Sequence, residues 1–299
     1  MRKGEYNMNI DGILMPINPD FIEVFSVFIN KDQLEKIRAQ NVRQYTEGII
    51  DLLLKDKIIP LMKENEQYDG LTQKKILGYL DAYDSDISAK IRKIFEIGGK
   101  ASHFRSKVSE EEVSEIIELA IHIVEDIFVK YFTEDKHHFG TEEIFTIFSM
   151  LPLKNRIYIL EKLSKTYINV EIVDRLSLAY FKNGEMEKAI DLLKSTFDSS
   201  LIDESFFHVQ INKLKILQKN LEEVISKNKG YDDSGKFFAK TDGNVMIVGF
   251  PSSNNIFDTK KAIAYFEKIG EECKHKYPEF MRLFFFLMQT DDRHYENIE

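Results

Sequence analysis

The chain has one cysteine and no tryptophan among its 299 residues. Cys273 alone cannot form an intramolecular disulfide, and a zinc ribbon or a paired-thiol redox site needs several thiolates. His275 follows it closely, but helix positions i and i+2 point to different sides, so nothing supports a reactive thiol. A lone cysteine suits a reducing compartment, and we therefore expect a cytoplasmic protein.

Long apolar runs and an excess of positive charge are also missing. The most apolar segment, FMRLFFFLM (280–288), is about half as long as the ~20 residues of a membrane span, so it predicts a buried segment or an interface. The start of the chain is interrupted by Pro16, Asn18 and Pro19 and is not typical of a secretory signal. The net charge of −9 argues against general nucleic-acid binding. We expect no membrane partner, and RNA binding has only weak support.

Apolar residues recur at helical spacing through the first half of the chain. Ser109 with Glu112 makes a capping box before the longest pattern, and Asp32 with Glu35 predicts a similar cap for the first one. Gly98, in a Gly-Gly pair, is expected to close a helix in the left-handed conformation. The expected helices span 32–55, 72–82, 85–98 and 110–132, enough for a four-helix bundle.

Shorter helical units follow a polar stretch at 134–140, where we place a domain boundary. The segment KFFAKTDGNVMIVGF (236–250) predicts a small β-hairpin around Asp242-Gly243. We expect a mainly α fold with an N-terminal segment at 1–30, a bundle at 31–135 and a helical-hairpin domain at 141–299. The expected helices of the second half span 141–150, 153–166, 170–183, 185–197, 203–227, 258–270 and 278–290.

The segment DRLSLAYFKNGEMEKAIDLL (174–193) is similar to a tetratricopeptide repeat. The similarity covers one repeat of about 34 residues, with 144–167 as a poorer second copy. It implies a surface that binds proteins or peptides, and the alternative is a helix pair that simply packs there. The residues at the packing positions of the repeat are Leu176, Tyr180, Gly184, Ala189 and Leu193.

Two motifs do not support a cofactor or a metal. GYDDSGKF (230–237) has the spacing of a phosphate-binding loop, but Phe237 replaces the required hydroxyl and a strand is expected after it instead of a helix. His137, His138 and Glu142 lack a further imidazole or thiolate at metal-ligand spacing. We therefore expect no cofactor and no metal site.

Helix order and two segments, RAQNVRQYTEGIIDLL (38–53) and IRKIFEIGGKASHF (91–104), resemble the HEPN superfamily. The chain is most similar to a bacterial branch whose members are sometimes fused to restriction enzymes and other defence proteins. In this branch the third helix ends in an Arg-x-x-Gly-Asn-x-x-Ala-His-like pattern. The resemblance covers about residues 30–133. Gly98 and His103 match the glycine and histidine of the pattern, whereas Phe95 and Gly99 stand where Arg and Asn are usual.

The resemblance implies a four-helix bundle that often forms a homodimer, and in active members an Arg and a nearby His cleave RNA without a metal. The positions that this spacing allows before His103 hold Glu96, Ile97 and Gly98. A carboxylate there would repel the phosphate. We therefore interpret Gly98, His103 and Arg105 as structural or binding residues.

These observations predict a non-catalytic binding or assembly protein with a protein partner, in a bacterial defence or toxin-like setting. The alternative is a metal-independent ribonuclease that uses His103 with Arg105, or with Arg38 or Arg43 of the first long helix. A third hypothesis places an enzyme site at the β-hairpin and PSSNN (251–255).

Overall fold

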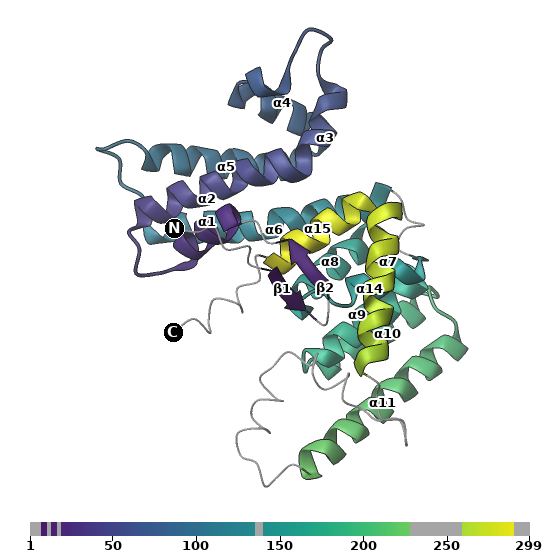
Figure 1. Cartoon of the computed structure of the whole chain (residues 1–299). Coiled ribbons are helices and arrows are strands. Elements are labelled where there is room, and N and C mark those ends of the chain that lie inside the picture. Colours follow the sequence, from purple (N-terminus) through teal and green to yellow (C-terminus); the bar gives the residue numbers. More distant parts are fainter. Residues whose placement is uncertain (1–6, 11–12, 17–18, 135–139, 228–258, 290–299) are drawn as a thin grey trace. The chain divides into compact units, whose positions relative to one another are not determined.

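The computed structural model describes residues 7–10, 13–16, 19–134, 140–227 and 259–289. It is mainly α, as the sequence predicts (Figure 1). The described residues include one antiparallel ribbon, in which Asn7 pairs with Pro16 and Ile10 with Ile13. Its strands are β1 (Asn7–Ile10) and β2 (Ile13–Pro16). The β-hairpin expected at 236–250 and the PSSNN segment lie outside the described residues.

The described residues group into two compact units. The first contains the residues up to Lys130 together with those from Glu271, and the second runs from Tyr131 to Gly270. This grouping places α15 (Pro278–Gln289) with the first unit, whereas we expected 141–299 to form one domain. The first division falls inside α6 (Glu110–Glu134) and not in the polar stretch after it.

The first helix of the first unit is α1 (Pro19–Ile29), which the sequence analysis did not predict. The first long helix starts later than expected, at Glu35. Its N-cap residue is Leu34, whose side chain makes no capping hydrogen bond. The predicted Asp32 cap is therefore wrong, and the Asp32 amide instead donates to Asn30 Oδ1 at 2.9 Å. Pro60 lies in a 3-10 turn at the end of this helical stretch. The elements are α1 (Pro19–Ile29), α2 (Glu35–Ile49), the π-helical turn η1 (Ile50–Leu54), α3 (Lys55–Ile58), the 3-10 turns η2 (Ile59–Leu61) and η3 (Tyr68–Gly70), α4 (Gln73–Tyr83), α5 (Ser85–Ala101), α6 and α15.

Aromatic rings from three helices form the centre of the first unit. The buried ring of Tyr45 on α2 lies 5.2 Å from Phe28 and 5.8 Å from Phe25 of α1, and 5.7 Å from Phe286 of α15, measured between ring centres. Such tilted contacts stabilise a core beyond the area they bury. Most of the apolar side chains of the 280–288 segment are buried, with Phe280 fully inaccessible, which confirms the prediction of a buried segment, although Arg282 within it is exposed.

The helix expected to end at Gly98 continues to Ala101, so that prediction is wrong. Gly98 instead lies where α5 contacts α2. A Cβ atom added to Gly98 would lie 2.6 Å from Arg43 Cβ and 3.2 Å from the Ala39 carbonyl oxygen. The glycine is needed for this close approach of two helices, which sequence periodicity does not reveal.

The predicted capping box at the start of α6 is confirmed. The Ser109 amide donates to Glu112 Oε2 at 2.9 Å, and the Glu112 amide donates to Ser109 Oγ at 3.2 Å. These bonds satisfy two backbone donors that the first helical turn leaves without a partner.

The second unit is a series of antiparallel helices that pack on their neighbours in sequence, α8 on α9, α9 on α10 and α10 on α11 (Figure 1). Their bounds agree with the predicted segments to within a few residues. Ala189, Leu193 and Leu214 are fully buried in the cluster that joins the last three helices. The elements are α7 (Glu142–Phe148), α8 (Leu153–Thr166), α9 (Val170–Lys182), α10 (Met186–Asp198), α11 (Glu204–Lys227) and the first part of α14 (Thr259–Lys276).

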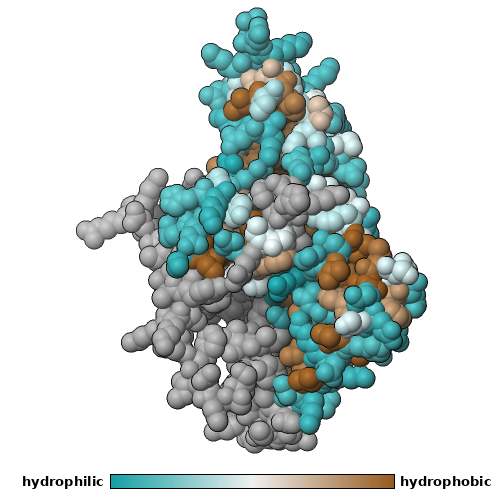
Figure 2. Space-filling view, turned by 90° about the vertical axis from the view of Figure 1, so that its right-hand side faces the viewer, coloured by the Kyte–Doolittle hydropathy of each residue, from teal (hydrophilic) through white to brown (hydrophobic). Residues whose placement is uncertain are grey.

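The described surface seen in Figure 2 is mostly hydrophilic, with separate hydrophobic patches. Among the large hydrophobic side chains, Phe104 is 98% exposed. In the part of the chain that the structure describes, no helix combines the length and apolar character needed to cross a membrane.

Candidate functional site

The loop after α5 presents the predicted residues His103 and Arg105 at the surface, on either side of Phe104. Lys36 on α2 fixes this loop through its backbone, since its Nζ donates to the carbonyl oxygens of His103 at 2.9 Å and Phe104 at 3.1 Å. Among the described residues, no hydrogen bond joins the His103 side chain to Arg43 or Arg105. The backbone of this loop is therefore held by Lys36, while the side chains of His103, Phe104 and Arg105 are exposed.

The two arginines of α2 that the ribonuclease alternative requires both have protein partners. Arg38 is 3% exposed, donates to the Phe28 carbonyl oxygen at 3.0 Å and contacts both carboxylate oxygens of Glu110 at 2.7 and 2.8 Å. Arg43 pairs with Glu47 at 2.9 Å, and its side-chain stem packs on Gly98. These contacts give both arginines a structural role.

The residues of the repeat-like hairpin lie in and around the contact between α9 and α10. Leu176, Ala189 and Leu193 are buried, and half-buried Tyr180 donates its hydroxyl to Glu161 Oε1 at 2.7 Å. Burial and this carboxylate raise the pKa of Tyr180. Gly184 makes the turn with φ of +78°, a conformation that favours glycine.

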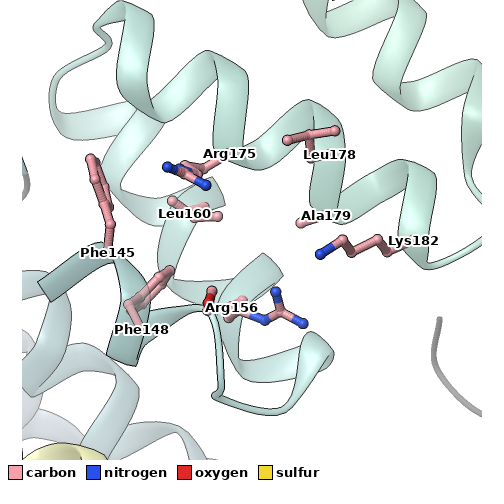
Figure 3. A pocket seen from close by; sticks show the side chains of 9 residues that line it. Phe145, Phe148, Arg156, Leu160, Arg175, Leu178, Ala179 and Lys182 are labelled. Carbon is pink, nitrogen blue, oxygen red and sulfur yellow. The ribbon is translucent and has the colours of Figure 1, made fainter. Parts of the chain in front are cut away.

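A cationic pocket lies in the second unit between α7, α8 and α9. Its volume is about 40 Å³. One water molecule needs roughly 10–15 Å³ by this measure, so the pocket has room for a small ion. The side chains that line it are shown in Figure 3 and belong to Phe145, Phe148, Ser149, Arg156, Leu160, Arg175, Leu178, Ala179 and Lys182.

All three charged side chains of the described lining are positive. Arg156 on α8 is 5% exposed, and its charged end points toward that of Lys182 on α9 (Figure 3). Arg175 on α9 points toward Phe145, with its guanidinium carbon 4.7 Å from the ring centre. Like charges that converge in a partly buried site raise the positive potential there.

The pKa of Lys182 is strongly shifted. Burial first, and then the charges of Arg156, Arg175 and Lys213, lower it to about 8. Among the described residues Lys182 has no ion pair. The nearest acid on the same helix, Asp174, lies 3.0 Å from Lys213 Nζ and 3.9 Å from Arg175 Nε. The positive charge of Lys182 is thus left without a matching carboxylate in the lining.

The lining of the pocket is poor in groups that can move protons. A lysine of lowered pKa is the kind that forms imines with carbonyl compounds. That reaction needs groups to move protons, and the described lining contains neither a carboxyl nor an imidazole group. Its one hydroxyl, on Ser149, donates to the Thr146 carbonyl oxygen at 2.7 Å. The arrangement suits recognition of an anion.

Within the described ranges, no three His, Cys, Asp or Glu side chains come together in a way that could bind a metal ion. His137, His138 and the GYDDSGKF segment lie outside these ranges. Cys273 is buried. His122 is half-buried and contacts Glu125 through Nδ1. Both residues are integrated into packed helices.

The sequence analysis did not identify the cationic pocket. One signal was present, because Arg175 and Lys182 lie about two helical turns apart and therefore on the same face of α9. Nothing in the sequence pairs this face with Arg156, since that contact depends on how α8 packs against α9.

No protein-family model matches the chain, no curated protein is similar enough in sequence to count as a match, and no solved structure matches the fold. The resemblances to the HEPN superfamily and to a tetratricopeptide repeat therefore stay predictions.

Proposed function

We propose that this chain is a non-catalytic binding protein whose second unit captures an anionic group of a protein partner. The observation that supports this most strongly is the pocket in which Arg156, Arg175 and Lys182 converge without a carboxylate in the described lining. Among the described residues Lys182 has no ion pair, and burying such a cation is unfavourable, so Lys182 is stabilised when an anion enters the pocket.

The surrounding helices support the same proposal. A series of paired helices gives an extended surface on which a peptide can lie beside the pocket, as in proteins built from repeats. The tetratricopeptide-like pattern at 174–193 adds to this, because such arrays generally bind proteins or peptides. The pocket would then fix one charged group, while neighbouring helix faces contact the rest of the segment.

For the first unit we propose an assembly role, with self-association through the bundle and a setting in bacterial defence. Both parts of this proposal come from the HEPN resemblance alone. Measuring the mass in solution by light scattering tests the first part, since a homodimer would have twice the 35.0 kDa of the chain.

The binding proposal is tested by purifying the tagged full chain from its native host and identifying what is bound. We expect a partner that stays bound to the unsubstituted protein and to Lys194→Met, which removes an exposed lysine of α10, but is lost from Lys182→Met. Equal retention by Lys182→Met would contradict the proposal. RNA cleavage in the presence of chelator that disappears in His103→Ala would favour the ribonuclease instead.

A further inference from the structure

We propose that the Nζ amine of Lys182 reacts reversibly with carbon dioxide to form a carbamate, which makes the pocket between α7, α8 and α9 a modification site. This inference goes beyond the proposed function and does not depend on it. Because the carbamate replaces the ammonium charge of Lys182, carbon dioxide would compete with an anionic group of a partner for this pocket.

The position of Lys182 is the first argument. Its side chain lines the pocket and is half-buried, and its amine points toward the charged end of Arg156 (Figure 3). The pocket volume of about 40 Å³ has room for the one carbon and two oxygens that carbon dioxide adds. Among the described residues Lys182 has no ion pair that would hold its proton. The amine is therefore accessible to a small molecule and is not held by a carboxylate.

The protonation state of Lys182 is the second argument, because only the neutral amine is nucleophilic. Burial and neighbouring cations lower its pKa from 10.5 to about 8, which increases the neutral fraction near neutral pH on the order of 100-fold. Lys188 on α10 is the opposite case. Its Nζ donates to Glu185 Oε1 at 2.7 Å, and this bond raises its pKa. Carbon dioxide should therefore distinguish the two lysines.

The charge of the product is the third argument. The cations that repel the ammonium group of Lys182 are Arg156 on α8, Arg175 on α9 and Lys213 on α11, and Asp174 pairs with the last two. A carbamate has one negative charge, so each of these repulsions becomes an attraction. A protonated imine would keep the positive charge, and acylation would give a neutral amide. The surrounding charges therefore favour carbon dioxide over other electrophiles.

The reaction needs no further reactant. The ammonium group of Lys182 first releases a proton to water, and the lone pair of Nζ then forms a bond to the carbon of carbon dioxide. One C–O π bond breaks and leaves its electron pair on oxygen, while the nitrogen releases a second proton to water. Since protons are released, occupancy at constant carbon dioxide pressure should rise as the pH increases through about 8.

The test is chemical trapping on the full chain, equilibrated at about pH 8 with subsaturating, isotope-labelled carbon dioxide. A trialkyloxonium salt converts a carbamate to a stable ester, and mass spectrometry of the digested protein identifies the lysine that carries it. We expect the ester on Lys182 at an occupancy on the order of 100-fold higher than on Lys188. Replacing carbon dioxide by nitrogen before trapping should remove it, because the modification is reversible.

Matched variants isolate the site. In carbon NMR spectra, Lys182→Met should lose one carbamate signal and keep that of the α-amino group, whose ordinary pKa is about 7.7–8.0. Lys188→Met should keep both signals. Arg175→Gln should lower the occupancy of Lys182, since loss of this cation favours the ammonium form and removes an attraction to the carbamate. Absence of the ester on Lys182, an occupancy no higher than on Lys188, or a higher occupancy in Arg175→Gln would overturn the proposal.

Discussion

The guanidinium group of Arg175 lies over the ring of Phe145, with 4.7 Å between its central carbon and the ring centre. Cation–π contacts of this kind are strongest where water is excluded. Phe145 belongs to α7 and Arg175 to α9. The ring of Phe145 therefore holds the charged group of Arg175 in position across two helices. It defines one wall of the pocket on which the proposed function depends.

Replacing Lys182 should make the protein more stable at neutral pH. Burial first, and neighbouring cations second, lower the pKa of Lys182 from 10.5 to about 8 in the folded state. The folded state therefore binds this proton more weakly than the unfolded state does, which destabilises the protein below about pH 8. We expect Lys182→Met to raise the free energy of unfolding by about 1–2 kcal/mol at pH 7, measured by urea denaturation.

The difference in the pKa of Lys182 between the folded and unfolded states also determines how the stability gain of Lys182→Met depends on pH. The penalty disappears between pH 8 and pH 10.5, where the folded state first and the unfolded state later release the proton. The stability advantage of Lys182→Met over the unsubstituted chain should shrink across this window, while Lys194→Met shows no such trend. A difference that is constant between pH 7 and pH 10 would show that the ammonium charge of Lys182 is not destabilising.

Two helical glycines should respond oppositely to alanine. A Cβ at Gly98 would lie 2.6 Å from Arg43 Cβ, and it would also crowd a backbone carbonyl oxygen, whereas no atom lies within 4 Å of a Cβ added to Gly78 on α4. We expect Gly98→Ala to lower the free energy of unfolding by about 1–3 kcal/mol through overpacking. Gly78→Ala should raise it by about 0.5–1 kcal/mol through helix propensity. A stabilised Gly98→Ala protein would show that α2 and α5 are further apart than described.

Ser200 is a site where glycine should stabilise the chain. It follows α10 with φ of +57°, its amide donates to the Phe197 carbonyl oxygen at 2.8 Å, and the Leu201 amide donates to that of Thr196 at 2.9 Å. This bonding pattern ends helices in a left-handed residue and favours glycine there. Ser200→Gly should raise the free energy of unfolding by about 0.5–1 kcal/mol, measured by thermal and urea denaturation.

The matched control is Ser199→Gly, one residue earlier, where φ is −85°. Glycine brings no conformational benefit at this position and removes the hydroxyl that donates to the Ser195 carbonyl oxygen at 2.8 Å. We expect no gain in stability from this change. Equal effects of the two substitutions would contradict the left-handed assignment of Ser200.

Replacing Arg38 on α2 should lower the stability of the fold much more than replacing Arg105 in the loop after α5. Arg38→Ala removes donors from the buried Phe28 carbonyl oxygen and from Glu110, so we expect a loss of about 2–4 kcal/mol. Arg105 is exposed, and Arg105→Ala should leave stability within about 0.5 kcal/mol of the original value. Comparable losses in the two variants would show that the loop is part of the packed structure.

Most helices of the second unit could be predicted from sequence because each is short, periodic and bounded by turn residues. The segment expected at 153–166 is the observed α8, and the helices from α7 to α11 lie within two residues of their expected bounds, whereas α14, expected at 258–270, continues to Lys276. By contrast, α1 was missed, although Phe21, Phe25 and Phe28 recur at helical spacing, because prolines before it favoured an irregular segment. The end of α5 was predicted too early for a different reason. Glycine can end a helix, but it can also lie inside a helix where a neighbouring helix packs closely against it.

The candidate site was less accessible to prediction than the fold. Arg156 and Lys182 belong to different helices, and only the packing of α8 on α9 places their charges together. His103 and Arg105 were chosen as candidate site residues because they are near each other in sequence and because of the family resemblance. They lie in an exposed loop. Sequence patterns report contacts within one helix much better than contacts between helices.

The most direct test of the account is an NMR titration of the lysine side chains, with Lys182 assigned by its loss in Lys182→Met. We predict that Lys182 titrates near pH 8 in the free protein, because burial and the neighbouring cations disfavour its charged form. A Lys182 that titrates near 10.5 would contradict the cationic pocket on which the proposed function depends.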